Sequence, residues 1–595
     1  AFGKGTPHQL TNCPWCGKKI NPGRNIRVEL KEAGRGRTFQ YCSDFMGNCP
    51  FSFKQSPDEG IPIVVVDEEI YRLLPALVIA TVDKYAQMPW KGPTQMLFGR
   101  VDGYCPRHGF RSPDLEDSDS HPKKGPFPAV KTKPMGPLRP PDLIIQDELH
   151  LISGPLGSLV GLYETAIDRL SASEVNGRWV RPKVIASTAT IRQAQDQVHR
   201  VFMRRVEVFP PHGLDLANNF FAVRREPGPD TPGRRYLGIC APGERLKSTL
   251  IRTYIALLAA AQTLYDGRGY GAAADPWMTL VGYFNSLREL GGMRRLIDDD
   301  IRARLRNAQD RGFSRRFLNP PFVEELTSRK QAGDIPKLLD WMEVEFDPVK
   351  EAARKARFKA SAGEGGRPRT KPGRGFDKPL DLLLATSMIS VGVDVQRLGL
   401  MTVTGQPKNT AEYIQATSRV GRRHPGLVCT VYNWARPRDL SHYERFAHYH
   451  ATFYQHVEAL SVTPFASGAL ERGLAGVIVA LIRLLTDEYN ANLRAQDLDK
   501  SRPIVQEAIE AIVRRVEAVE GKSLAAAVRK EINVKLDKWL KQAQGQGYQL
   551  GYQASKDGTA TALLRNPGEG KWQPFTTLHS LRDVEPSVGL ILKEH

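Results

Sequence analysis

Short apolar runs that end in polar residues recur along most of this chain, and this pattern constrains its fold more than any other feature. In the first half the runs lie at 76–81, 143–146 and 184–187, with helical patterns between them. Runs of this kind are typical of buried parallel strands. Because parallel strands need long crossovers, usually helices, we predict an α/β domain over residues 75–225.

The same alternation returns in the second half. A helical pattern over 246–264 is followed by strand-like runs at 278–284, 382–385, 400–403 and 427–432. We therefore predict a second parallel α/β domain over 235–440, joined to the first by a Pro- and Gly-rich hinge at 226–234. Residues 441–595 have a mainly helical pattern and are predicted to form a C-terminal extension.

Two segments interrupt the alternation. Residues 111–141 are dense in Pro, Lys and Asp, which predicts a loop that leaves the sheet. Residues 361–378 are basic and rich in Gly and Pro, which favours a mobile loop, with nucleic-acid contact as the alternative.

The charge balance points to an anionic partner. The chain has 84 Lys and Arg against 65 Asp and Glu, a net charge of +19, and such a surface attracts nucleic acid, although a merely basic soluble protein is the alternative. The most apolar run, 474–485, contains Arg483 and is shorter than the roughly 18 residues of a membrane span. Seven cysteines, four of them near the start, favour a reducing, cytoplasmic setting over a secreted disulfide framework.

Two carboxylates and an imidazole follow the apolar run at 143–146: Asp147, Glu148 and His150. At the end of a buried strand, one carboxylate can hold Mg²⁺ through water, and its neighbour can position or deprotonate an attacking water. A chance acidic turn before a helix is the alternative.

Small hydroxyl side chains gather at two further strand ends. The first group, which also suits a helix cap, is Ser187, Thr188 and Thr190. The second group includes a close-approach glycine and a carboxylate, and consists of Thr386, Ser387, Gly392 and Asp394. Such groups suit phosphate and ribose contacts.

Two arginines follow in the segment 415–422. Arg419 and Arg422 lie three residues apart, on one face of a helix, and Gln415 precedes them. Guanidinium groups placed in this way can reach the γ-phosphate of a nucleotide from a second domain.

The order and spacing of these segments resemble the superfamily 2 DExH helicases. DELH at 147–150, STAT at 187–190, TSMISVGVD at 386–394 and QATSRVGR at 415–422 are similar to motifs II, III, V and VI. Residues 80–84, 281–288 and 326–329 look like motif Ib, motif IV and the segment after it. The resemblance covers residues 79–434 and implies two RecA-like domains, with ATP between them and nucleic acid across both.

The resemblance implies a role for each matching residue. Asp147 would hold Mg²⁺, Glu148 would activate water, and Arg419 with Arg422 would stabilise the transferred phosphoryl charge. Further residues would complete the nucleotide contacts or couple the nucleotide site to the bound nucleic-acid strand. They are His150, Ser187, Thr188, Thr190, Gly392, Asp394 and Gln415. Those implied to contact nucleic acid are Thr81, Lys84, Asn285, Ser286, Arg288, Thr327, Arg329, Thr386 and Ser387.

Within the superfamily, residues 146–157 and the form of 415–422 look most like the DrmA family, the helicase subunits of the DISARM anti-phage system. This resemblance implies an ATPase that acts on DNA, single-stranded or at a duplex end. It also implies a DrmB-like partner subunit, a methyltransferase and a role in bacterial defence.

One part of such a helicase is missing from the sequence. A Gly-rich loop that ends in Gly-Lys-Ser/Thr should precede motif II, because its amides and lysine cradle the β- and γ-phosphates. No such sequence occurs here. We expect the loop to lie upstream of Ala1, which leaves the first RecA-like domain incomplete on its N-terminal side. An RNA helicase and a nucleic-acid-binding scaffold without ATPase activity are the alternatives.

Cysteines near the start have the spacing of zinc ligands. A C-x2-C pair and a C-x6-C pair supply Cys13, Cys16, Cys42 and Cys49. This set suits tetrahedral Zn²⁺ and predicts a zinc-binding module with a lead-in over residues 1–74, with free core cysteines or a redox pair as alternatives. Cys105 and His108 form a further C-x2-H pair, and a lone pair of this kind is more often structural.

Overall fold

The computed structural model describes residues 7–582, apart from 33–34, 116, 189–193, 212, 216–217, 219, 222, 224, 229–230, 232, 319, 331–332, 364–377, 391–392, 460, 546–547 and 556. The chain divides into two compact units, Ala1–Glu207 with Ala459–His595, and Val208–Glu458. The first boundary between the units, after Glu207, lies before the predicted hinge at 226–234. The domain boundaries proposed from the sequence stay predictions.

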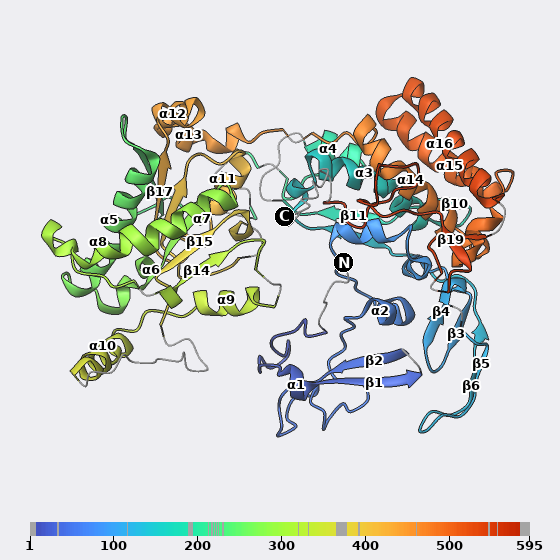
Figure 1. Cartoon of the computed structure of the whole chain (residues 1–595), viewed down its shortest axis with the longest axis horizontal. Helices are drawn as coiled ribbons and strands as arrows, with labels where there is room; N and C mark the ends of the chain where they lie inside the picture. Colours follow the sequence, from blue (N-terminus) through green and yellow to red (C-terminus); the bar gives the residue numbers. More distant parts are fainter. Residues whose placement is uncertain are drawn as a thin grey trace, which may run out of the picture. The chain divides into compact units, whose positions relative to one another are not determined.

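The second unit is built on a six-stranded sheet in which every neighbouring pair is parallel, in the order β12-β17-β16-β13-β15-β14 (Figure 1). Its strands are β12 (Arg234–Cys240), β13 (Leu280–Phe284), β14 (Val323–Leu326), β15 (Leu382–Ala385), β16 (Leu400–Thr404) and β17 (Gly426–Tyr432). Every residue of β13, β15 and β16 is buried. The four predicted strands are confirmed, within two residues at each end, and so is the α/β class.

Helices cover both faces of this sheet. Alternate residues of β13 join different clusters of buried side chains, Leu280 and Phe284 in one and Val281 and Tyr283 in the other, as expected when successive side chains of a strand point to opposite faces. The first cluster includes residues of α5 (Leu246–Asp266), α7 (Leu287–Leu296) and α8 (Arg302–Arg306). The second includes residues of α9 (Ile335–Met342), α11 (Thr410–Thr417) and α13 (Phe446–Thr452).

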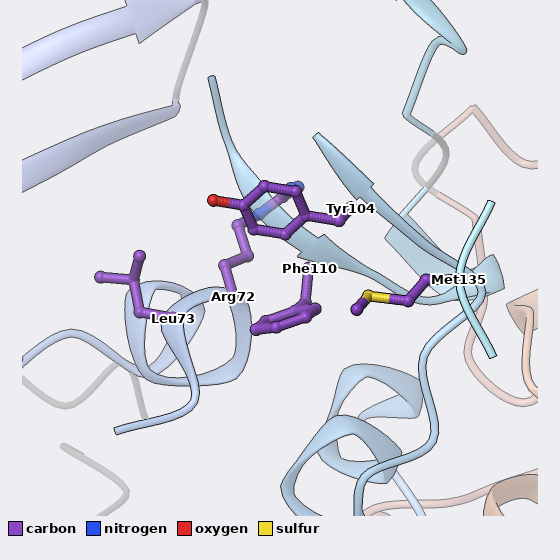
Figure 2. Close-up of a pocket in the computed structure, with 5 residues that line it drawn as sticks. All are labelled: Arg72, Leu73, Tyr104, Phe110 and Met135. Carbon is purple, nitrogen blue, oxygen red and sulfur yellow. The ribbon is translucent and has the colours of Figure 1, made fainter. Parts of the chain in front are cut away.

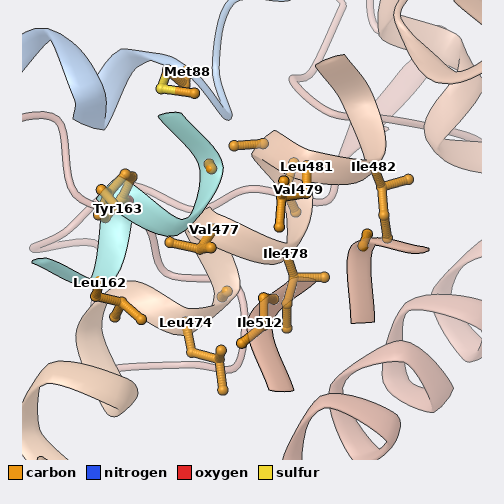
Figure 3. Close-up of a cluster of buried hydrophobic side chains, with 14 of the residues drawn as sticks. Met88, Leu162, Tyr163, Leu474, Val477, Ile478, Val479, Leu481, Ile482 and Ile512 are labelled. Carbon is orange, nitrogen blue, oxygen red and sulfur yellow. The ribbon is translucent and has the colours of Figure 1, made fainter. Parts of the chain in front are cut away.

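The first unit has a helical core that joins two distant parts of the sequence. It contains α3 (Gly154–Leu170), α4 (Ala194–Phe202), α14 (Ser467–Leu484), α15 (Pro503–Glu520) and α16 (Lys522–Ala543). Figure 3 shows Leu162 and Tyr163 of α3 among apolar side chains of α14, with Ile512 of α15 nearby. The helices predicted beyond residue 441 therefore pack directly on the helix that follows Asp147 and Glu148.

A short parallel pair of strands lies beside this core. β8 (Leu143–Gln146) pairs with β11 (Lys183–Ala186), with Gln146 opposite Ala186. The strand predictions at 143–146 and 184–187 are confirmed in position, but the prediction that both strands are buried is wrong. Ile145 is 61% exposed and Ile185 is 47% exposed, because no other described strand pairs with β8 or β11.

The strand predicted at 76–81 is also wrong. These residues form no helix or strand, and Ile79 is 88% exposed. An apolar run becomes a buried strand only where a neighbour supplies hydrogen bonds and a covering layer, and none of the described residues supplies either one here.

Short strands lie just before and within the segment 111–141, where the excursion loop was predicted. β3 (Gly103–Cys105) lies between β4 (Gly109–Arg111) and β7 (Lys133–Pro134), and β5 (Ser120–His121) pairs with β6 (Val130–Lys131). The other named elements are α1 (Pro22–Asn25), β1 (Ile26–Glu32), β2 (Arg35–Gln40), α2 (Asp67–Leu73), β9 (Ser173–Val175), β10 (Arg178–Val180), α6 (Asp275–Met278), α10 (Pro348–Gly363), α12 (Pro437–Glu444), β18 (Gln549–Gly551) and β19 (Ala560–Ala562). Nowhere in the described part of the chain is a helix both long and apolar enough to cross a membrane.

Glycines of α14 permit its close approach to α3. A Cβ on Gly476 would lie 2.2 Å from the hydroxyl of Tyr163, which is fully buried. We expect Gly476→Ala to destabilise the fold by about 1–3 kcal/mol through overpacking. Gly468, near the exposed start of the same helix, has no atom within 4 Å of its Cβ position, so Gly468→Ala should stabilise by about 0.5–1 kcal/mol. Thermal unfolding midpoints that fall for both variants, or for neither, would contradict this packing.

Candidate nucleotide and zinc sites

The ends of β8 and β11 bring a carboxylate and a hydroxyl together. The Ser187 N–H donates to the Gln146 carbonyl at 3.0 Å, and the Leu149 N–H donates to the Ser187 carbonyl at 2.9 Å. The Ser187 hydroxyl donates to Oδ1 of Asp147, which also accepts from the Glu148 N–H at 2.9 Å. The parallel register thus holds the Asp147 carboxylate in one orientation, with its other oxygen available at an exposed position.

Glu148 and His150 occupy the turn that follows. Glu148 has φ of +51°, which is uncommon for a residue with a Cβ and often marks a functional site. The buried imidazole of His150 has Nδ1 3.4 Å from Oε2 of Glu148 and 3.4 Å from the Thr188 hydroxyl. His150 therefore links the carboxylates after β8 to the hydroxyls after β11.

Sequence reasoning missed Gln197 of α4, which holds this turn. Its buried amide donates to the carbonyls of Leu149 and Ile152, at 3.2 and 2.7 Å. The predicted coupling residue Thr190 lies outside the described residues.

In the second unit, Arg419 and Arg422 both contact the segment that follows β15. Arg419 donates to the Val393 carbonyl at 2.9 Å and to the Ser390 carbonyl. Arg422 forms an ion pair with Asp394, and its Nε donates to the Ser418 carbonyl at 3.2 Å. Arg419 and Arg422 lie beyond the end of α11, in the turn that follows Thr417, so the prediction that they share one face of a helix is wrong. Gly392 lies outside the described residues.

The backbone around these arginines explains their placement. Gly421 has φ of +71°, and a Cβ there would lie 2.9 Å from the Cα of Gly426, so glycine is required for the turn from α11 into β17. Arg234 of β12, which sequence reasoning did not identify, donates to the Val420 carbonyl at 2.8 Å and to the Ser418 carbonyl at 3.3 Å. Gln415 is buried on α11.

Some of the residues after β13 that were predicted to contact nucleic acid form hydrogen bonds within the second unit. The Asn285 amide donates to the Thr404 carbonyl at 3.0 Å, and the Ser286 hydroxyl caps α7 by accepting from the Glu289 N–H at 3.2 Å. Arg288, on the first turn of that helix, is exposed. Of these residues, Arg288 is thus best placed to meet a phosphate.

The remaining predicted contacts differ in exposure. Thr327 is buried and accepts from the Arg329 N–H at 3.4 Å, whereas the Arg329 side chain is exposed. Thr81 is exposed, and the Lys84 ammonium pairs with Asp67 at 2.8 Å in the first unit. After β15, Thr386 is half-buried and Ser387 is exposed.

Four cysteines converge near the start of the chain. The sulfurs of Cys13, Cys16, Cys42 and Cys49 all lie within 4.8 Å of one another. The Cys13–Cys49 distance is 3.9 Å and the Cys16–Cys42 distance is 3.3 Å. Zn–S bonds of about 2.3 Å in a tetrahedron would place the sulfurs about 3.8 Å apart, so the arrangement fits Zn²⁺.

The surroundings of the cysteines shift their pKa values in opposite directions. Burial raises the pKa of Cys42 and of Cys49. A hydrogen bond with the Lys18 backbone, followed by one with Cys42, lowers the pKa of Cys16 to about 7, and the thiolate is the form that binds metal. The buried Asp44 carboxylate accepts from the Cys49 N–H at 2.7 Å and pairs with Lys18 at 2.7 Å. Such outer contacts orient metal ligands.

Comparisons with known proteins place part of the second unit in a helicase family. Residues 358–424 match the family "Helicase conserved C-terminal domain". The solved structures that resemble this fold include the DUF1998 helicase MrfA bound to DNA and AMPPNP, with a TM-score of 0.37, 15% identity, and coverage of 57% of this chain and 37% of that chain. They also include the Mycobacterium smegmatis helicase Lhr bound to ssDNA and AMP-PNP, with a TM-score of 0.34, 13% identity, and coverage of 62% and 38%.

The sequence likeness is stronger and extends along nearly the whole chain. The chain is 39% identical to the DISARM protein DrmA of Bacillus paralicheniformis over 602 aligned residues, which cover 98% of this chain and 49% of that protein. It therefore spans about half the length of this curated relative. The chain is a relative of the DISARM protein DrmA, and its residues 358–424 match the conserved C-terminal domain of helicases.

Proposed function

We propose that this chain forms most of the motor of an ATP-dependent DNA helicase or translocase, which acts in the cytoplasm as part of a DISARM-type anti-phage complex. The observation that carries the proposal is the pair of contacts between two strand ends, Ser187 to Asp147 and Thr188 to His150. They join a candidate ATPase centre to groups on the next strand, which is what a motor needs to couple hydrolysis to movement. The relationship to the DISARM protein DrmA supports a place in a DISARM-type complex. DNA is proposed as the polymer and a DrmB-like subunit as the partner.

The chemistry proposed for the first unit uses both carboxylates. Asp147, oriented by Ser187, would supply an oxygen ligand to Mg²⁺. When bound, Mg²⁺ would supply positive charge against the charge that develops on the phosphate oxygens of ATP. Glu148, held beside it by the left-handed turn, orients the attacking water and takes up its proton.

We propose that Arg419 and Arg422 of the second unit give up contacts within that unit and bind the phosphates of the nucleotide instead. The Asp394 side chain is 65% exposed and that of Arg422 is 28% exposed. Because an exposed ion pair contributes only about 0–1 kcal/mol, a phosphate can replace Asp394 as the partner of Arg422. Bidentate binding of phosphate by Arg would favour this exchange.

We also propose that the phosphate-binding loop comes from sequence upstream of Ala1. The exposed apolar side chains of Leu143, Ile145 and Ile185 support this proposal, because the strands of a parallel sheet are normally buried on both faces. Additional βαβ units beside β8 and β11 would supply helices that cover these side chains and would complete the first RecA-like domain.

The four cysteines are proposed to bind one structural Zn²⁺. The distances between their sulfurs and the lowered pKa of Cys16 support this role. One link to the rest of the unit is the Thr38 N–H, which donates to the Glu69 carboxylate of α2 at 2.9 Å. Loss of the metal should therefore unfold residues of the module and leave the Asp147 region intact.

Glu148→Gln tests the assignment of the general base. The amide keeps the size of the side chain but cannot accept the proton, so we expect ATP turnover in the full-length protein to fall by about 10²-fold or more, with nucleotide binding retained. Glu174→Gln, at an exposed position of β9 in the same unit, is the matched control and should leave turnover unchanged. Normal turnover in the Glu148→Gln variant would show that the base is misassigned.

Four arginine variants separate catalysis from DNA binding. Arg419→Ala and Arg422→Ala should lower turnover by up to about 10³–10⁵-fold with little change in DNA affinity, because the guanidinium groups act on charge that develops in the transition state. Arg288→Ala and Arg329→Ala should instead weaken DNA binding and flatten its salt dependence. Fluorescence anisotropy across a salt series and steady-state ATPase rates measure both properties. Lost DNA binding with normal turnover in Arg422→Ala would contradict the assignment.

Zinc content tests the cysteine module. In the full-length protein, Cys16→Ser should lower the zinc content by about one equivalent per chain, measured by elemental analysis, because a structural site is nearly full at neutral pH. Cys240→Ser, at a cysteine of β12 outside the cluster, should keep the zinc content of the wild type. An unchanged zinc content in Cys16→Ser would rule out this site.

A further inference from the structure

A second group of potential metal ligands lies in the first unit, apart from the four cysteines. Cys105, His108 and His121 are 0%, 8% and 4% exposed, and their ligand atoms all lie within 4.8 Å of one another. Sγ of Cys105 is 3.5 Å from Nδ1 of His108, and the two imidazole rings have centroids 4.6 Å apart. His121 is a member that the sequence pattern did not reveal.

Local structure brings two of these ligands together in one turn. Residues 105–108 connect β3 to β4, and the His108 N–H donates to the Cys105 carbonyl at 3.2 Å. Gly109, with φ of +92°, follows at once, and a Cβ there would lie 2.3 Å from the Arg72 carbonyl. Only glycine allows the turn to lie this close to α2.

The two faces of this hairpin have different surroundings. Along β3, Tyr104 is exposed between the buried residues Gly103 and Cys105, so the Tyr104 and Cys105 side chains point to opposite faces. Tyr104 and Phe110 pack edge to face and line a hollow of about 400 Å³ (Figure 2). Cys105 is therefore directed away from this hollow, into the protein.

The third ligand comes from a separate hairpin. His121 lies on β5, opposite Val130 of β6. No residue of 120–131 belongs to any apolar cluster found among the described residues. The hairpin is also basic, with exposed side chains at Lys123, Lys124 and Lys131. Apolar packing does not explain why this hairpin stays on β3 and β4.

Polar contacts hold the same two hairpins together. The buried Arg107, within the 105–108 turn, donates to the carbonyls of Pro122 and Pro128, at 2.8 and 2.7 Å. Its guanidinium also lies over the ring of Phe127, 5.8 Å from the centroid. The cluster of Cys105, His108 and His121 thus joins the same two segments as Arg107 does.

We propose that Cys105, His108 and His121 bind a second Zn²⁺, which cross-links the 120–131 hairpin to β3 and β4. Zn–S of about 2.3 Å and Zn–N of about 2.0–2.1 Å in a tetrahedron place sulfur and nitrogen about 3.5 Å apart, which matches the distance from Cys105 to His108. One thiolate and two imidazoles form a donor set that suits zinc. The three side chains leave one tetrahedral position for a water molecule.

The experiment measures zinc in the full-length protein by elemental analysis. His121→Ala and Cys105→Ala should each lower the zinc content by one equivalent per chain, and Cys16→Ser combined with His121→Ala should lower it by two. His121→Cys replaces one zinc ligand with another and should keep the wild-type content. Substitution with Co²⁺ should give a thiolate-to-metal absorption band in the Cys16→Ser variant that disappears when His121→Ala is added.

Two matched controls are available within the chain. Cys429, buried in β17, and His199, exposed on α4, lie outside both clusters, so Cys429→Ala and His199→Ala should keep the wild-type zinc content. Unchanged zinc in both Cys105→Ala and His121→Ala would overturn the proposal. The proposal would also fail if His121→Cys and His121→Ala lost zinc equally, because that would reflect local unfolding and not the loss of a ligand.

Discussion

The hydrogen bond from the Ser187 hydroxyl to the Asp147 carboxylate is the interaction on which the rest of this account depends. It exists because β8 and β11 are neighbouring parallel strands that end in register, with Gln146 opposite Ala186. Parallel strands present the residues that follow them at one edge, so two segments 40 residues apart meet there. The turn that carries Glu148 and His150 is built on the same edge.

This edge is supported by a core that the C-terminal part of the chain completes. Arg483, in the most apolar run of the sequence, is buried in α14 and donates to the carbonyls of Trp90 and Asn490, both at 2.9 Å. It also pairs with Asp114 at 3.0 Å. Removal of one partner of a buried pair typically costs about 3–5 kcal/mol. Arg483 thus fastens α14 to segments on either side of β3 and β4.

The sequence predicted those strands that have neighbouring strands and covering helices within the chain. The strands β13, β15 and β16 are buried at every position, so apolar runs located them well. The run at 76–81 is also apolar but has no pairing strand among the described residues, and a pattern in one segment cannot reveal whether a neighbour exists. Motif spacing identified Arg419 and Arg422 but placed them on a helix, because the pattern does not show that α11 ends at Thr417.

Contacts between distant segments could not be predicted in the same way. His121 joins Cys105 and His108 only because two hairpins fold onto each other, and its spacing from His108 was the single available signal. Arg234 and Gln197 act through backbone carbonyls, which any sequence offers, so no pattern marks their partners. Side chains that bind across hairpins or to main-chain atoms need a structure to be found.

The most direct test of the central claim is the ATPase rate of the full-length protein with single-stranded DNA, with RNA of the same sequence, and without nucleic acid. If the edge formed by Asp147, Glu148 and Ser187 is the hydrolytic centre of a DNA motor, DNA should stimulate turnover several-fold more than RNA. Greater stimulation by RNA would show that the polymer is misassigned. Absence of hydrolysis under all three conditions would contradict the account and leave a nucleic-acid-binding scaffold in its place.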